Sequence, residues 1–155
     1  MKRCVITFII VVSIVALVSA QEYKTGIGLR GGFSSGLTIK HFTNPKVALE
    51  GLLTTRWQGF VITGLYEVHN QAFDVAHLKW YYGGGAHIGF YNGNYVYWGT
   101  NGTTYTIVGI DGILGIEYTF SEIPINIGID WKPALNLIGY SGIWSEGGIS
   151  VRYVF

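Results

Sequence analysis

Alternation of apolar and polar residues with a period of two runs through most of this chain, and it constrains the fold more than any other feature. Such a period places successive side chains on opposite faces of a β-strand. In segment 36–42, for example, Leu37 and Ile39 lie on one face and Lys40 on the other. Eight segments follow the same rule. We therefore predict antiparallel strands at 26–33, 36–42, 47–56, 59–68, 79–91, 106–118, 123–132 and 147–155.

The charged faces of these strands favour a membrane-inserted sheet over a soluble one. They combine glycines with isolated charges, and charged residues make up only 12% of the chain, against about 25% in soluble domains. The apolar faces carry large aromatic residues near the strand ends, as membrane barrels do at their interfaces. These residues are Phe33, Phe42, Trp57, Trp80, Tyr82, Phe90, Tyr118, Phe120, Trp131 and Tyr153. The prediction is an all-β chain that forms an eight-stranded antiparallel transmembrane β-barrel; a soluble sandwich and a lipocalin-like barrel are the alternatives.

The charges on the inner faces of such a barrel balance in sign. The predicted polar network of the lumen comprises Arg30, Lys40, Glu50, Arg56, Glu67, His87, Asp111, Glu117, Asp130, Lys132 and Arg152. Side chains fill the interior of an eight-stranded barrel, and a buried charge without a partner costs several kcal/mol. Folding the hairpins on short turns places Lys40 opposite Glu50 and Asp111 opposite Lys132. We predict both ion pairs, and an acidic partner for Arg152.

The first 20 residues have the pattern of a secretory signal peptide. Two basic residues at positions 2–3 precede an aliphatic run at 5–17, and small residues at 18–20 precede Gln21. The run is shorter than the ~20 residues of a membrane-spanning helix, which disfavours a retained anchor. Cys4, the single cysteine, precedes the run, which disfavours a lipoprotein. We predict a signal peptide at 1–20 and an exported barrel domain at 21–155.

The charge balance of the mature chain argues against a nucleic-acid partner. Removal of Lys2 and Arg3 leaves 8 of the 10 basic residues against 9 acidic ones, a net charge of −1. Nucleic-acid binding would call for a basic patch. The mature chain also lacks cysteine, so disulfides do not stabilise the predicted barrel.

The C-terminal strand carries an apolar row that ends on an aromatic residue at the terminus. This row is Ile149, Val151, Tyr153 and Phe155. It resembles the C-terminal assembly signal of bacterial outer-membrane β-barrels. Together with the stretches 80–90 and 109–118, it makes the chain similar to small outer-membrane barrels such as the membrane anchor of outer-membrane protein A and uncharacterised barrels of the Bacteroidota kind. The resemblance implies insertion into the outer membrane by the barrel-assembly machinery, which would recognise the last strand, and it supplies no catalytic residue.

The connections between strands give an expected orientation. With both termini in the periplasm, the outer connections are 34–35, 57–58, 92–105 and 133–146. The last two are long and rich in Gly, Tyr, Asn and Thr, so loops 92–105 and 133–146 are the candidate surface for an extracellular ligand. Long outer loops and short periplasmic turns are usual in such barrels. The inner connection 69–78 is longer than expected and suggests no function.

Chemical motifs in the chain are weak. Segment 26–31 matches G-x-G-x-x-G, but it lies inside a strand and lacks the helix of a dinucleotide site. The histidines show no metal-ligand spacing, and we expect no cofactor. His87 and Asp111 point inward from neighbouring strands, which leaves a lipid acyltransferase-like enzyme as one alternative and a small-solute conduit as another. The leading prediction is a non-enzymatic, monomeric barrel with a closed, salt-bridged lumen and a structural or surface-interaction role.

Overall fold

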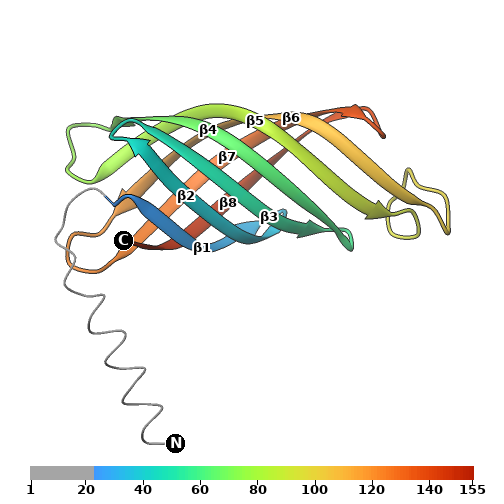
Figure 1. Ribbon diagram of the computed structural model, residues 1–155, viewed down its shortest axis with the longest axis horizontal. Helices are drawn as coiled ribbons and strands as arrows, with labels where there is room; N and C mark the ends of the chain where they lie inside the picture. The colour runs from blue at the N-terminus through green and yellow to red at the C-terminus, as the bar shows by residue number, and fades with distance from the viewer. Residues whose placement is uncertain (1–22) are drawn as a thin grey trace, which may run out of the picture.

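The computed structural model describes residues 23–155, which form a closed antiparallel barrel (Figure 1). Its eight strands are β1 (Thr25–Gly32), β2 (Ser35–Asn44), β3 (Val47–Arg56), β4 (Gly59–Gln71), β5 (Leu78–Asn92), β6 (Thr104–Thr119), β7 (Ile125–Ile138) and β8 (Gly142–Val154). The predicted eight-stranded fold is confirmed. Among residues 23–155 no helix is long and apolar enough to cross a membrane. The predicted signal peptide, 1–20, lies outside the described residues.

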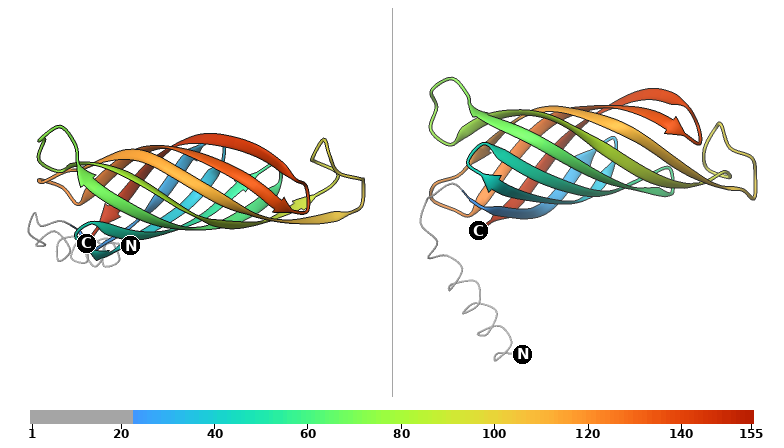
Figure 2. Two further views of the ribbon diagram at one scale, coloured as in Figure 1. Left: turned by 90° about the horizontal axis from the view of Figure 1, so that it is seen from above. Right: turned by 45° about the horizontal axis from the view of Figure 1, so that its top comes forward.

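The strands connect at two ends of the barrel that differ in character (Figure 2). The end that holds the C-terminus, which we call the terminus end, also carries the β2–β3 turn and segments 72–77 and 120–124. The opposite end, which we call the loop end, carries the connections 33–34, 57–58, 93–103 and 139–141. Segment 93–103 is the longest of these and projects beyond the strands (Figure 1).

The last strand closes the barrel against the first. Arg30 of β1 stands opposite Ser150, and Gly28 stands opposite Arg152. The ladder continues past β8, since the Phe155 amide donates to the Thr25 carbonyl over 2.8 Å. Backbone pairing with β1 therefore holds the C-terminal residues in place, as expected for a strand that continues to the end of the chain.

Side-chain alternation separates an apolar outside from a polar inside, as predicted. Large apolar residues are exposed on the outside of every strand, among them Leu29, Leu37, Leu49, Ile62, Tyr82, Leu114, Trp131 and Ile149. Charged residues on the opposite faces are buried, and Lys40, Glu67 and Arg152 are 0% exposed.

Phe42 is an exception to the predicted aromatic set, because it lies inside the barrel. It is 7% exposed and packs against Tyr23 and His69, with ring centroids 5.1 and 4.7 Å away. The physical reason is parity, because Phe42 is two residues from the inward-facing Lys40 and shares its face.

The predicted long loop at 133–146 is wrong. β7 continues to Ile138 and β8 begins at Gly142, so only residues 139–141 connect them. The sequence interpretation took Pro133 as the end of a strand. Instead, Pro133 stands opposite Ser145 of β8, and the β6–β7 ladder is interrupted between Asp111 and Leu114, where proline has no amide hydrogen to donate.

Two other connections have left-handed backbone; the inner one is shorter than predicted, whereas the β3–β4 turn at 57–58 has the predicted length. β4 extends to Gln71, which reduces the inner connection to 72–77, where Phe73, Asp74 and His77 have positive φ. The β3–β4 connection is a two-residue turn in which Trp57 and Gln58 have φ of 48° and 54°. Two consecutive positive φ angles fit a type I′ hairpin turn, which favours Asn and Gly. Gln58 therefore occupies a position where a Cβ is costly.

We predict that Gln58→Gly raises the free energy of unfolding by about 1 kcal/mol, because glycine adopts a positive φ without steric cost. The measurement is urea unfolding of the protein refolded in detergent micelles. Gln58→Ala is the matched control, since alanine keeps the Cβ and gains nothing from the turn. Equal midpoints for the two variants would contradict the strain assigned to this turn.

Candidate functional site

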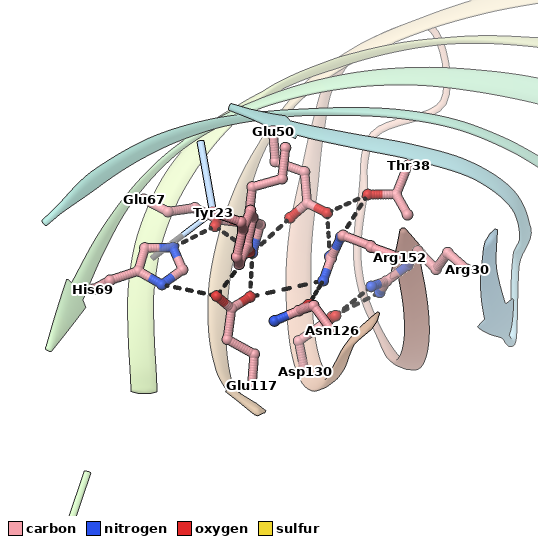
Figure 3. Close-up of polar contacts among 11 residues, drawn as sticks. Tyr23, Arg30, Thr38, Glu50, Glu67, His69, Glu117, Asn126, Asp130 and Arg152 are labelled. Atoms are coloured by element: carbon pink, nitrogen blue, oxygen red, sulfur yellow. Dashed lines mark hydrogen bonds and ion pairs between the residues drawn. The ribbon is translucent and has the colours of Figure 1, made fainter. Parts of the chain in front are cut away.

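Lys40 is the centre of a buried ion-pair cluster near the terminus end. Figure 3 shows its three carboxylate partners, Glu50, Glu67 and Glu117, turned toward one another inside the barrel. The Lys40 Nζ lies 2.8 Å from Glu67, 3.2 Å from Glu117 and 3.4 Å from Glu50. These carboxylates come from β3, β4 and β6, so a single ammonium joins four strands. The predicted Lys40–Glu50 pair, between strands adjacent in sequence, is one of these contacts.

Arg152 of β8 extends this cluster across the lumen. Its guanidinium pairs with Glu50 and lies 3.7 Å from Glu117. It also donates to Thr38 Oγ1 over 3.2 Å and to Asn126 Oδ1 over 3.1 Å. The acidic partner expected for Arg152 is thus present, on a strand 102 residues away in sequence.

Three aromatic and imidazole side chains complete the cluster. Tyr23 donates its hydroxyl hydrogen to Glu117 over 3.0 Å, and His69 Nε2 lies 3.0 Å from Glu67. Tyr81 lies beneath Lys40, whose Nζ is 4.0 Å from the ring centroid. Burial, followed by the negative charge of Glu117, raises the pKa of the Tyr23 phenol well above its ordinary value, which keeps the phenol protonated as a donor.

His69 and Tyr81 were not among the predicted lumen residues, although strand parity could have identified them. His69 is two residues from the inward-facing Glu67. Tyr81 lies between Trp80 and Tyr82, whose exposed side chains mark the outer face.

Arg30 and Asp130 form a second bridge across the interior. The two terminal guanidinium nitrogens of Arg30 donate to the Asp130 carboxylate, Nη1 to Oδ2 and Nη2 to Oδ1 over 2.7 Å. A Cβ on Gly148 would lie 2.4 Å from the Arg30 guanidinium carbon, so the absence of a side chain there makes room for the arginine. The bridge joins β1 to β7, which are not neighbours in the sheet.

A third cluster lies toward the loop end. Lys132 Nζ is 2.9 Å from Asp111 and 3.1 Å from Glu146. His87 Nδ1 is 2.6 Å from the other oxygen of Asp111. The predicted Asp111–Lys132 pair is therefore present. Glu146 is 2% exposed and was missed because it fell in the loop wrongly predicted at 133–146.

The hydrogen bonds of this third cluster fix both ring nitrogens of His87. Trp144 Nε1, which is only a donor, lies 3.2 Å from Asn136 Oδ1. The same Oδ1 lies 3.0 Å from His87 Nε2. Because Nδ1 faces the Asp111 carboxylate, each ring nitrogen of His87 has a polar partner within the protein.

Arg56 lies apart from the other predicted lumen charges. Its guanidinium carbon is 4.0 Å from the ring centroid of Trp57 and 5.0 Å from that of Trp144. Within residues 23–155 it forms no ion pair. The structure thus brings ten of the eleven predicted lumen residues into three charge clusters and leaves Arg56 at the loop end. The described residues contain no group of His, Cys, Asp and Glu side chains that could hold a metal ion.

Comparison with known proteins shows the fold. No family model and no curated protein matches the chain significantly. Among solved structures, it is similar to the N-terminal β-barrel domain of Pseudomonas aeruginosa OprF, with a TM-score of 0.66 and 15% sequence identity over 86% of this chain and 100% of that domain. The two share a fold. The predicted similarity to small outer-membrane barrels is confirmed at this level.

We predict that Lys40→Met destabilises the barrel by about 3–5 kcal/mol, because it leaves three buried carboxylates without their shared cation. The midpoint of urea unfolding in detergent is the measurement. Lys46→Met is the matched control, because Lys46 is exposed in the β2–β3 turn. If the two variants unfold at the same urea concentration, Lys40 is not the stabilising cation of the buried carboxylates.

The Arg30–Asp130 bridge gives a second prediction through a double-mutant cycle. Arg30→Leu and Asp130→Leu each leave one buried charge unpaired and should each cost about 3–5 kcal/mol, whereas the double variant should cost less than either single one. Arg30→Leu combined with Thr55→Ala, an exposed position, should be additive. Additive energies for Arg30 and Asp130 would refute a direct interaction.

Proposed function

We propose that this chain is a non-enzymatic, integral outer-membrane protein whose lumen is closed by buried ion pairs. The observation that carries the proposal is the set of bridges between strands that are not adjacent in the sheet: Arg30 with Asp130, Lys40 with Glu117, and Arg152 with Glu50. Each bridge crosses the interior, so together they occupy the path that a solute would follow. Eight-stranded barrels have interiors that side chains fill.

The outer surface supports a position in the lipid bilayer. Apolar side chains exposed around the barrel would each lose contact with water on insertion, which is favourable. Backbone amides and carbonyls are paired around the closed sheet, as a hydrocarbon environment requires. The similarity to the barrel domain of OprF and the predicted signal peptide both fit the outer membrane.

The last strand supports assembly by the barrel-assembly machinery. Ile149, Val151, Tyr153 and Phe155 are all exposed on the outer face, at 54%, 46%, 37% and 48%. They form one continuous apolar row that a partner strand or machine could contact before β8 pairs with β1. Under this proposal, the terminus end faces the periplasm and segment 93–103 faces the exterior.

The two alternative functions find less support in the polar interior. A lipid acyltransferase-like reaction would need His87 as a base, but both of its ring nitrogens already face partners within the protein, Asp111 and Asn136. In the described part of the chain no serine or threonine hydroxyl bonds to this histidine. A small-solute conduit would need an open path through the three charge clusters.

We predict that the refolded protein gives no large steady conductance in planar lipid bilayers, because the cross-lumen pairs fill the channel. Heat-modifiable mobility in gel electrophoresis shows beforehand that the preparation is a folded barrel. Detergent without protein is the blank. A large, steady, protein-dependent conductance would overturn the closed lumen, and a monomer that stays soluble without detergent would overturn the membrane assignment.

A further inference from the structure

A small cavity opens among aromatic side chains at the loop end, and His87 of the third charge cluster forms part of its lining. Its volume is about 110 Å³, and its lining includes Arg56, Trp57, Tyr91, Trp98, Tyr140 and Trp144. We call it the outer vestibule. A dry cavity of about 150 Å³ holds benzene, so the enclosed part of the vestibule is smaller than a sugar ring and a bound sugar would lie partly outside it.

The aromatic wall of the vestibule is held in place by contacts within the protein. Trp98 stacks on Tyr140 with centroids 4.7 Å apart and an interplanar angle of 10°, and it meets Tyr91 edge-on at 5.9 Å. Val96, from the same loop, is 6% exposed and packs with Tyr91 in an apolar cluster. The wall therefore needs no ligand to form, which reduces the entropy lost when one binds.

Arg56 gives the vestibule an unbalanced positive charge. The other interior arginines and lysines, Arg30, Lys40, Lys132 and Arg152, all have carboxylate partners. Arg56 has instead the rings of Trp57 and Trp144. A guanidinium over an indole keeps its in-plane N–H groups available, and this fork matches a carboxylate or phosphate.

The same cations exclude a cationic ligand. An aromatic cage alone would suit a quaternary ammonium group. Here, however, Arg56 and Lys132 already lie 5.0 and 4.9 Å from the Trp144 ring centroid. Because Lys132 is paired with Asp111 and Glu146, Arg56 is the charge that repels a second cation and attracts an anion.

The floor of the vestibule offers a hydrogen-bond donor rather than an acceptor. Asn136, which is 8% exposed, commits its Oδ1 to His87 and Trp144. Its Nδ2 group is the remaining polar group of that side chain. Aromatic walls, the Arg56 guanidinium and an amide donor together match a ring with a flat apolar face, hydroxyl groups and an acidic substituent.

We propose that the outer vestibule binds an acidic sugar unit of the hexuronic acid class. The carboxylate would pair with Arg56, the C–H face of the sugar would pack on an indole, whose ring face is negative, and a hydroxyl would accept from Asn136. The unit can be a free sugar acid or the terminal residue of a polysaccharide, since both have the same chemistry. The inference depends on the fold of the loop end and not on a closed lumen.

Tryptophan fluorescence titration of the full chain refolded in detergent tests the proposal, with glucuronic acid, glucose, glucosamine and inorganic phosphate as probes. Glucuronic acid should bind at least about tenfold more tightly than glucose or glucosamine, because only it pairs with the guanidinium. Arg56→Gln should abolish this preference. Lys46→Gln, at the exposed β2–β3 turn, should keep it.

Other outcomes would contradict the proposed site or show whether its ligand is a free sugar or the end of a polysaccharide. Equal binding of glucose and glucuronic acid, or an unchanged preference in Arg56→Gln, overturns the proposal. Phosphate that binds as tightly as glucuronic acid reduces the vestibule to a simple anion site and overturns the sugar assignment. Tighter binding of a glucuronate-terminated oligosaccharide supports a polysaccharide source, and equal binding supports the free sugar.

Heat-modifiable mobility establishes that each variant is folded. If Arg56→Gln does not fold, Arg56→Lys replaces it. Lysine keeps the charge without the planar fork, so a reduced but measurable preference for glucuronic acid is expected. A preference equal to that of the unchanged protein would overturn the role of the guanidinium.

Discussion

Charge neutralisation inside a closed barrel is the constraint on which the rest of this structure depends. An ion removed from water costs several kcal/mol unless partners surround it. Lys40 meets this requirement with carboxylates from three strands, and Arg152 meets it with Glu50 and two neutral acceptors. Since these partners come from different parts of the chain, the interior is satisfied only when all eight strands are in place. Barrel closure and charge pairing are therefore mutually dependent.

Strand parity explains why much of the fold was accessible from sequence. The period of two assigns each residue to a face, and short turns fix the register between neighbouring strands. The pairs of Lys40 with Glu50 and of Asp111 with Lys132 follow from these two facts. The Arg30–Asp130 bridge does not, because its residues are 100 positions apart and meet only through the curvature of the closed sheet. Local pattern carries no information about which residues face each other across a lumen.

Pro133 shows where local rules mislead. Proline usually ends or borders a strand, and on this ground the segment after it was interpreted as a loop. In the barrel, the missing amide hydrogen falls at a gap in the β6–β7 ladder while pairing to β8 continues. The misinterpretation removed Glu146 and Trp144 from the predicted interior. The prediction therefore lacked Glu146, the second carboxylate partner of Lys132, and Trp144, which forms one wall of the outer vestibule.

The two halves of the interior differ in a way that bears on function. Toward the terminus end, Lys40 and Arg152 are surrounded by acidic groups, which leaves them no capacity for a ligand. At the loop end, Lys132 pairs with Asp111 and Glu146, His87 contacts Asp111, and Arg56 has aromatic neighbours. Arg56 is partly exposed rather than buried, so its charge stays hydrated without an acidic partner. Because this partly exposed cation lies beside preformed aromatic walls, it is the group that the proposed acidic sugar would contact first.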